Sequence, residues 1–135
     1  GISHFTSMGN ETAHIILRGG KSGPNYSQGD IEKTCKVLED KELLARVMVD
    51  FSHANSQKKY KNQLKVGESI ASQVEQGSER IFGVMIESHL NEGSQKVGPL
   101  DSLEYGVSIT DACIGWEDTD SLIRILAKSV NSRKN

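Results

Sequence analysis

Three short stretches of the chain are apolar on both faces, and each ends in a polar group. They cover residues 15–17, 47–51 and 81–86, with Asp50 as the one break inside them. A run that is apolar on both faces is typical of a strand buried inside a parallel sheet. The hydrophobic pattern therefore predicts three buried parallel strands.

Apolar residues at helical spacing predict a helix after each strand. The first helix begins near Ser27, which with Asp30 resembles a capping box, and the second stops at Gly77. The third is capped by Asp118 or Thr119. The positions expected to face the core are Ile31, Cys35, Leu38, Val66, Ile70, Val74, Leu122, Ile125, Leu126 and Val130.

The order of elements is strand, helix, strand, helix, strand, long loop, helix. Repeated right-handed βα units form a parallel sheet, either doubly wound or barrelled, although three strands cannot close a barrel that needs eight. Residues 89–111 show no clear periodicity and contain several glycines. A loop of this length in a compact domain is usually functional, so we expect it to border the active site.

Polar side chains follow all three strands, at the edge where parallel strands bind ligands. Arg18, His53 and Glu87 occupy these places. A neutral imidazole at such a position can ligate a metal or move a proton, although His53 could equally cap the turn after its strand. Counting alternate residues back from each polar group puts these side chains on the same inward face: Ile16, Val47, Val49, Phe51, Ile81 and Met85.

Asp111 ends the long loop, and we expect it to lie at the edge of the predicted sheet where His53 and Glu87 lie. One imidazole and two carboxylates suit a divalent first-row metal with positions left open for substrate. His89 is a possible fourth ligand, although it can also belong to the loop. The spacing therefore predicts a metal site at this edge.

Charge and composition limit the classes of partner, the cellular compartment and the kind of substrate that the sequence predicts. The net charge of −2 gives no sign of a nucleic-acid or anionic-membrane partner, and no apolar run approaches the ~20 residues that span a bilayer. Two cysteines do not form a disulfide framework, which indicates a reducing cytosol, and the basic run in 58–65 is expected to be a solvated face. Arg18 and Lys21 beside a metal favour an anionic substrate.

Four blocks of the chain resemble the C-terminal part of class I DAHP synthase, the 3-deoxy-D-arabino-heptulosonate-7-phosphate synthase. They are HIILRGGKSGPNY at 14–26, VMVDFSHANS at 47–56, GVMIESHL at 83–90 and YGVSITDACIGWEDTD at 105–120. The blocks cover nearly the whole chain in order.

The resemblance implies an α/β fold, the (β/α)8 TIM barrel, with parallel strands inside and helices outside. Residues 1–135 would be a C-terminal fragment of a single catalytic domain and supply its last three βα units, with 1–11 in an inserted hairpin and 89–111 as the active-site loop. The family condenses phosphoenolpyruvate with erythrose 4-phosphate and releases phosphate, the first step of the shikimate pathway to the aromatic amino acids.

The resemblance also implies roles for particular residues. His53, Glu87 and Asp111 match three of the family's ligands for a divalent metal ion of the Mn, Fe, Co or Zn type. The resemblance also implies that His53 and Asp111 are catalytic residues. Arg18 matches an arginine that holds the phosphate of phosphoenolpyruvate. The family's fourth ligand is a cysteine near the first strand, and neither cysteine of this chain stands in that place.

Two interpretations remain open at the level of sequence. In the first, the chain is part of a working cytoplasmic synthase that binds neither nucleic acid nor membrane and forms a homo-oligomer. In the second, it is an inactive truncated fragment that only self-associates, because the inward face and the outer strands would lie uncovered. Both interpretations predict that the chain alone has no synthase activity.

Overall fold

The computed structural model describes residues 5–7 and 15–134. Strands β2, β3 and β4 are parallel, and β1 pairs antiparallel with β2 in the order β1-β2-β3-β4. The expected hairpin in 1–11 lies outside the described residues except for the part that forms β1. The elements are β1 (Phe5–Ser7), β2 (Ile15–Leu17), α1 (Gln28–Asp40), β3 (Val47–Asp50), η1 (His53–Ser56), α2 (Asn62–Glu75), β4 (Ile81–Met85), η2 (Leu100–Ser102) and α3 (Trp116–Asn131).

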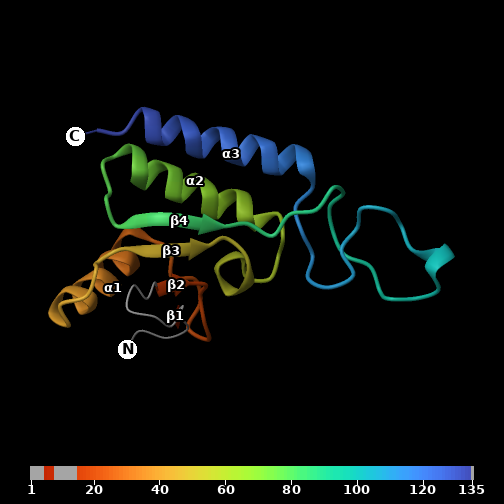
Figure 1. Ribbon diagram of the computed structural model, residues 1–135, viewed down its shortest axis with the longest axis horizontal. Helices are drawn as coiled ribbons and strands as arrows, with labels where there is room; N and C mark the ends of the chain where they lie inside the picture. Colours follow the sequence, from red (N-terminus) through yellow and green to blue (C-terminus); the bar gives the residue numbers. More distant parts are fainter. Residues whose placement is uncertain (1–4, 8–14, 135) are drawn as a thin grey trace.

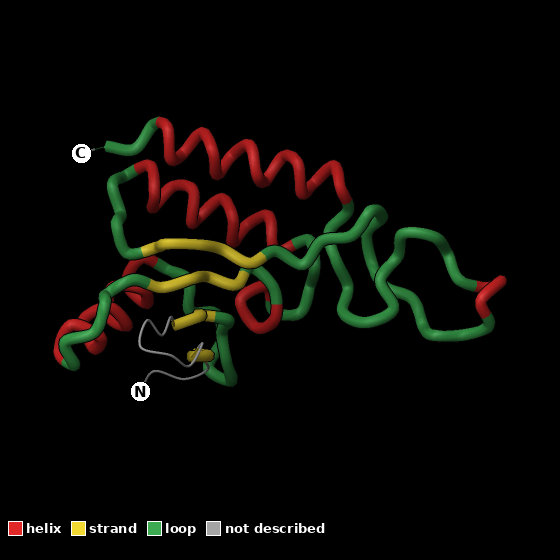
Figure 2. Tube along the Cα trace, in the orientation of Figure 1, coloured by secondary structure: helices red, strands yellow, loops and turns green. Residues whose placement is uncertain are grey.

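The helices are layered on the sheet, and the long loop stands away from both. Helix α2 runs alongside β4, and α3 runs alongside α2 (Figure 1). Residues 89–111 extend beyond this body, with η2 at the far tip, and are otherwise free of helix and strand (Figure 2). None of the helices in the described ranges has both the length and the apolar character that a membrane crossing requires.

The core lies between the sheet and the helices. Val47, Val49 and Phe51 are 0% exposed and pack with apolar side chains of α1, α2 and α3. They face the helices, so the prediction that they share the inward face with His53 is wrong. The chain leaves the extended conformation after Asp50, and His53 lies in η1 with a φ of 53°. Alternation holds only within a strand, and the count was carried through a turn.

Strand β4 changes sides because of an irregularity in its pairing. It begins in register with β3 at Ile81 and then shifts, so that Met48 lies opposite Gly83. Ile81 therefore packs against the core, contrary to the alternation count, because an extra residue in one strand reverses the side chains beyond it. Ile16 and Met85 lie on the side away from the helices, as expected, since Ile16 alternates with Ile15 and Leu17, which pack with the core, and Met85 is 43% exposed.

The ends of α1 and α2 form as the sequence predicts. The Ser27 hydroxyl accepts a hydrogen bond from the Asp30 amide at 3.1 Å and donates one to the Asp30 carboxylate at 2.8 Å. Gly77 follows α2 with a φ of 107°, the left-handed conformation that favours glycine at a helix end. Cys35 is fully buried, which confirms its place in the core, and the lysines in 58–65 are exposed.

Helix α3 departs from its prediction at the start. Its N-cap is Gly115, so Asp118 and Thr119 lie inside the first turn instead of capping it. The Thr119 hydroxyl donates to the Gly115 carbonyl at 2.8 Å, four residues back along the helix. Threonine in this position satisfies its own hydroxyl and contributes no cap.

The buried face of α3 is narrower than predicted. Leu122 is fully buried and Leu126 is partly buried, but Ile125 and Val130 are 40% and 55% exposed. Among the described elements the helix packs mainly against α2, so only one stripe is covered. This stripe has the spacing i, i+3, i+7, i+10 and consists of Thr119, Leu122, Leu126 and Ser129.

Gly67 permits the close contact between α2, α3 and the sheet. A β-carbon there would overlap the Cδ1 atom of Leu122 and lie 3.1 Å from Cε2 of Phe51. Both side chains are fully buried and cannot move into solvent. The absence of a side chain at this position therefore sets the distance between the two helices.

We predict that Gly67→Ala lowers the free energy of unfolding by about 1–3 kcal/mol, because overpacking outweighs the better helix propensity of alanine. Urea unfolding followed by circular dichroism measures this change. The matched control is Gly29→Ala in α1, where a new β-carbon meets only the Ser27 hydroxyl, at 3.9 Å. That variant should be unchanged or up to about 1 kcal/mol more stable. Equal effects of the two substitutions would contradict the packing argument.

Candidate metal centre

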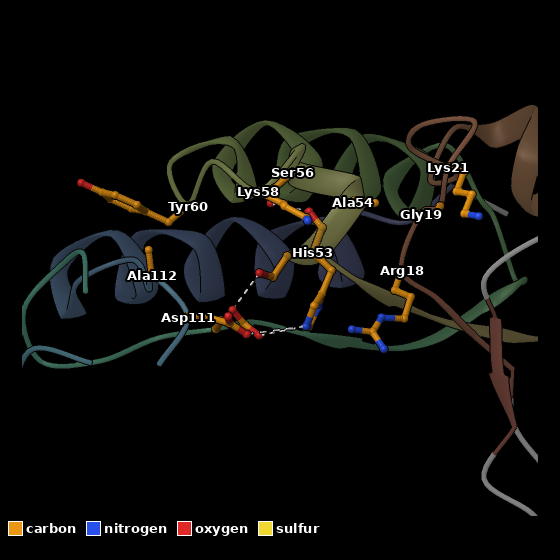
Figure 3. Close-up of a pocket in the computed structure, with 13 residues that line it drawn as sticks. Arg18, Gly19, Lys21, His53, Ala54, Ser56, Lys58, Tyr60, Asp111 and Ala112 are labelled. Atoms are coloured by element: carbon orange, nitrogen blue, oxygen red, sulfur yellow. Dashed lines mark hydrogen bonds and ion pairs between the residues drawn. The ribbon is translucent and has the colours of Figure 1, made fainter. Parts of the chain in front are cut away.

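A cavity of about 610 Å³ opens at the carboxyl ends of the parallel strands. It collects the polar groups that follow three separate strands and the loop, namely Arg18, Lys21, His53, Glu87 and Asp111. Figure 3 shows His53 and Asp111 pointing toward one another, with Arg18 on the neighbouring segment. The structure thus brings together the residues that the sequence placed at this edge.

The imidazole of His53 and two carboxylates converge on one point. The Nε2 atom of His53 lies 3.3 Å from Oε1 of Glu87 and 4.0 Å from Oδ2 of Asp111. One ligand atom from each of the three side chains lies within 4.8 Å of the other two. A metal ion about 2.0–2.2 Å from each ligand holds those ligands roughly 3–4 Å apart. The spacing and the donor set therefore fit one divalent ion. In the described part of the chain, His53, Glu87 and Asp111 form the one group of three or more histidine, cysteine or carboxylate side chains that lie close enough together to hold a metal ion.

His89 does not join this cluster. Its Nδ1 atom accepts a hydrogen bond from the Leu90 amide at 2.9 Å, and the residue lines a separate cavity formed by the 89–111 loop. Of the two alternatives for His89, a fourth ligand or a residue of the loop, the structure therefore supports the second. The chain has already turned into the loop two residues after Glu87.

Asp111 is positioned by the return of the long loop beside the end of β4. The Ile114 amide donates to the Glu87 carbonyl at 3.1 Å, and the His89 amide donates to the Ile114 carbonyl at 3.0 Å. These bonds extend the parallel pairing of the sheet by one short bridge beyond β4. The Asp111 side chain is 72% exposed, so it faces the open side of the cavity.

Cys113 follows Asp111 but is a structural residue. It exchanges backbone hydrogen bonds with Gly93, which fastens the base of the loop. Burial raises the pKa of its thiol, so the thiolate that would bind a metal is disfavoured. This agrees with the assignment of the site to one imidazole and two carboxylates.

Glu87 is held by buried polar side chains at both its backbone and its carboxylate. The Gln63 side chain is 0% exposed, accepts from the Glu87 amide at 3.0 Å and donates to the Glu87 carbonyl at 3.0 Å. The Ser52 hydroxyl donates to Oε2 of Glu87 at 2.8 Å. Oε1 is thereby left to face His53.

Arg18 owes its position to a buried amide. The side chain of Asn55 donates to the Leu17 carbonyl at 3.0 Å and to the Asp50 carbonyl at 2.8 Å, and its backbone amide donates to the Arg18 carbonyl at 3.1 Å. Gly19 follows with a φ of 77°, and a β-carbon there would lie 2.6 Å from the Asn55 nitrogen. Only glycine fits this approach.

The sequence did not reveal these supporting roles. Asn55 and Ser52 were visible as polar residues after a strand, and Asp50 as the polar break within it, but no pattern pairs Gln63 with Glu87. Residues 24 positions apart in the chain meet only because α2 packs beside β4. A polar residue on the apolar stripe of a helix is the signal that could have identified Gln63.

Comparisons with known proteins agree with the resemblance. A model described as the DAHP synthetase I family matches residues 2–124. The chain is 52% identical over 129 residues to the phospho-2-dehydro-3-deoxyheptonate aldolase of Haemophilus influenzae, covering 96% of this chain and 36% of that protein. It is also 52% identical over 128 residues to the Phe-sensitive aldolase of the same name from Escherichia coli, covering 95% of this chain and 36% of that protein.

A solved structure extends the agreement to the fold. The phospho-2-dehydro-3-deoxyheptonate aldolase of Francisella tularensis matches with a TM-score of 0.84 and 35% sequence identity, covering 98% of this chain and 42% of that one. Three parallel strands with helices are therefore confirmed and are consistent with part of a barrel. The chain spans about a third of the length of the curated relatives it matches, 36% of each of the two described above. Nothing in these matches supports the alternative of an inactive, self-associating piece.

We predict that divalent metal binding depends on the three converging side chains. His53→Ala should weaken the binding of Mn²⁺ or Co²⁺ by at least about tenfold, because it removes one of three ligands, and loss of an outer-shell partner alone costs ~10–100-fold. Isothermal titration of both proteins measures the change. Asp101→Ala, at the exposed tip of the loop, removes a side chain that could ligate a metal but lies outside the cluster, and it should leave the affinity unchanged. Equal affinities of wild type and His53→Ala would reject the assignment.

Proposed function

The chain belongs to the DAHP synthetase I family, and from that premise we propose that it forms part of an enzyme joining phosphoenolpyruvate to erythrose 4-phosphate. The products would be 3-deoxy-D-arabino-heptulosonate 7-phosphate and phosphate. This reaction would be the first step of aromatic amino acid biosynthesis. The observation that carries this proposal is the convergence of His53, Glu87 and Asp111 in one cavity with Arg18. Residues 89–111 would be the active-site loop of a single catalytic domain in the cytoplasm.

His53, Glu87 and Asp111 would hold the divalent metal of this enzyme, of the Mn, Fe, Co or Zn type. One nitrogen and two carboxylate oxygens are ligands that first-row divalent ions accept. Such an ion, when bound, polarises the aldehyde of erythrose 4-phosphate or orients the attacking water. The two carboxylates would otherwise face one another as like charges, so the donor set itself favours a cation.

Arg18 would bind the phosphate of phosphoenolpyruvate, with Lys21 as a second cation on the same wall of the cavity. The planar guanidinium presents paired N–H groups that match two phosphate oxygens. Fixed cations aimed at a phosphate also neutralise the charge that develops as the bond to it breaks. We further propose His53 and Asp111 as catalytic residues, since they border the same open space as Arg18.

We predict that phosphoenolpyruvate binding in the presence of Mn²⁺ depends on Arg18. Arg18→Ala should raise the dissociation constant by about 10–100-fold, because a hydrogen bond to a charged group contributes roughly 1.5–3 kcal/mol. Arg124→Ala is the matched control, since Arg124 lies on α3, 78% exposed and paired with Asp120. Titration calorimetry with phosphoenolpyruvate decides between them. Equal losses in both variants would point to bulk charge and against a phosphate contact.

The purified 135-residue chain should show no synthase activity by itself, because the family's fourth metal ligand and its other substrate-binding cations are not among the residues of this chain. A phosphate-release assay with both substrates and Mn²⁺ is the direct measurement. Turnover that persists after removal of any full-length synthase would show that this set of residues is sufficient.

A homo-oligomer stays a prediction of the sequence. Strand β4 ends the described sheet, and the exposed Met85 lies on the side away from the helices. Edges and apolar surface of this kind favour association. Sedimentation velocity at micromolar concentration should therefore give either a species larger than the 14.8 kDa monomer or a loosely packed, expanded chain. A compact monomer that unfolds cooperatively would contradict this expectation.

A further inference from the structure

We propose that Asp50 is the positioning residue of the metal centre: it fixes both the orientation and the tautomer of the His53 imidazole. The inference rests on the proposed metal site and assigns a role to a side chain that would not itself touch the ion. It explains why a carboxylate interrupts the otherwise apolar strand β3.

Both oxygens of the Asp50 carboxylate are used at the end of its own strand. Oδ2 lies 2.8 Å from Nδ1 of His53, and Oδ1 accepts a hydrogen bond from the Ser52 amide at 2.8 Å. Asp50 is 3% exposed, so water cannot easily take the place of either partner. The carboxylate therefore links the ring of His53 to the turn that carries it.

The contact with Asp50 decides which ring nitrogen faces the metal ligands. An ionised carboxylate only accepts hydrogen bonds, so Nδ1 carries the hydrogen. In the neutral ring the lone pair then lies on Nε2, the nitrogen 3.3 Å from Glu87 and 4.0 Å from Asp111. A metal ion requires that lone pair.

The backbone of His53 is itself in a costly conformation that the surrounding hydrogen bonds hold. Its φ of 53° lies in the left-handed region, which residues with a β-carbon adopt at a cost. The Ser52 amide bond to Asp50 holds the residue before it, and the His53 carbonyl accepts from the Ser56 hydroxyl at 3.1 Å and the Lys58 amide at 3.0 Å. The turn is thus fastened on both sides, and Asp50 is the part of it that also holds the ring.

The test is Asp50→Asn, which keeps the shape of the side chain. With its oxygen on the Ser52 amide, the new amide presents an NH₂ group to Nδ1 of His53. Nδ1 must then accept, the hydrogen moves to Nε2, and the lone pair facing Glu87 is lost. We expect affinity for Zn²⁺ or Mn²⁺ to fall about 10–100-fold, the range for partners behind a ligand.

The matched control is Asp40→Asn, the same atomic change at an exposed carboxylate that ends α1. It removes the same charge and should leave metal affinity unchanged. Circular dichroism and urea unfolding check that both variants remain folded. Equal affinity of wild type and Asp50→Asn would overturn the inference, while the metal site itself would stand.

A spectroscopic measurement on the wild-type chain decides the question independently of any variant. In ¹⁵N-labelled protein with Zn²⁺ bound, the imidazole correlations of His53 should show a protonated Nδ1 and a ligated Nε2. A ligated or unprotonated Nδ1 would overturn the inference, even if Asp50→Asn fails to fold. If the wild type binds no divalent metal at all, the proposed metal site fails first, and this inference fails with it.

Discussion

The carboxyl ends of the parallel strands depend on one constraint: buried backbone groups that have lost their strand partners must find others. Two side-chain amides meet this demand. Asn55 bonds to the ends of β2 and β3, and Gln63 bonds to both backbone groups of Glu87 after β4. Leaving such groups unpaired costs about 1–3 kcal/mol each, so these amides stabilise the edge that carries the candidate site.

The core uses the side of the strands that faces the helices, and the site uses their carboxyl ends. Val47, Val49 and Phe51 bury their side chains against the helices and give the sheet its stability. The residues that follow leave the extended conformation, and the turn at Ser52 and His53 points polar groups away from that core. The functional groups can therefore be polar and partly exposed without a cavity in the core, which is the usual division in folds built from βα units.

Much of this arrangement could be read from the sequence. The three strands, the N-cap at Ser27, the buried face of α1 and the stop at Gly77 all depend on neighbouring residues, and all are confirmed. The candidate ligands could be named because each follows an apolar strand or the long loop. Parallel strands bring their carboxyl ends to one edge, so local positions there predict spatial proximity.

Other features could be decided only by the tertiary structure. The facing of Val47, Val49 and Phe51 was predicted wrongly, since alternation could not be followed through the turn at His53 or past the irregularity between β3 and β4. The narrow buried stripe of α3 depends on what packs against it, and the pairing of Gln63 with Glu87 depends on α2 lying beside β4. The sequence by itself determined which side chains reach the strand ends. Packing between distant segments decided how Arg18 and Glu87 are held, because Asn55 and Gln63 bond to them or to their neighbours from positions far away in the chain. The ring of His53 is oriented locally by Asp50, but through a turn that the hydrophobic pattern did not reveal.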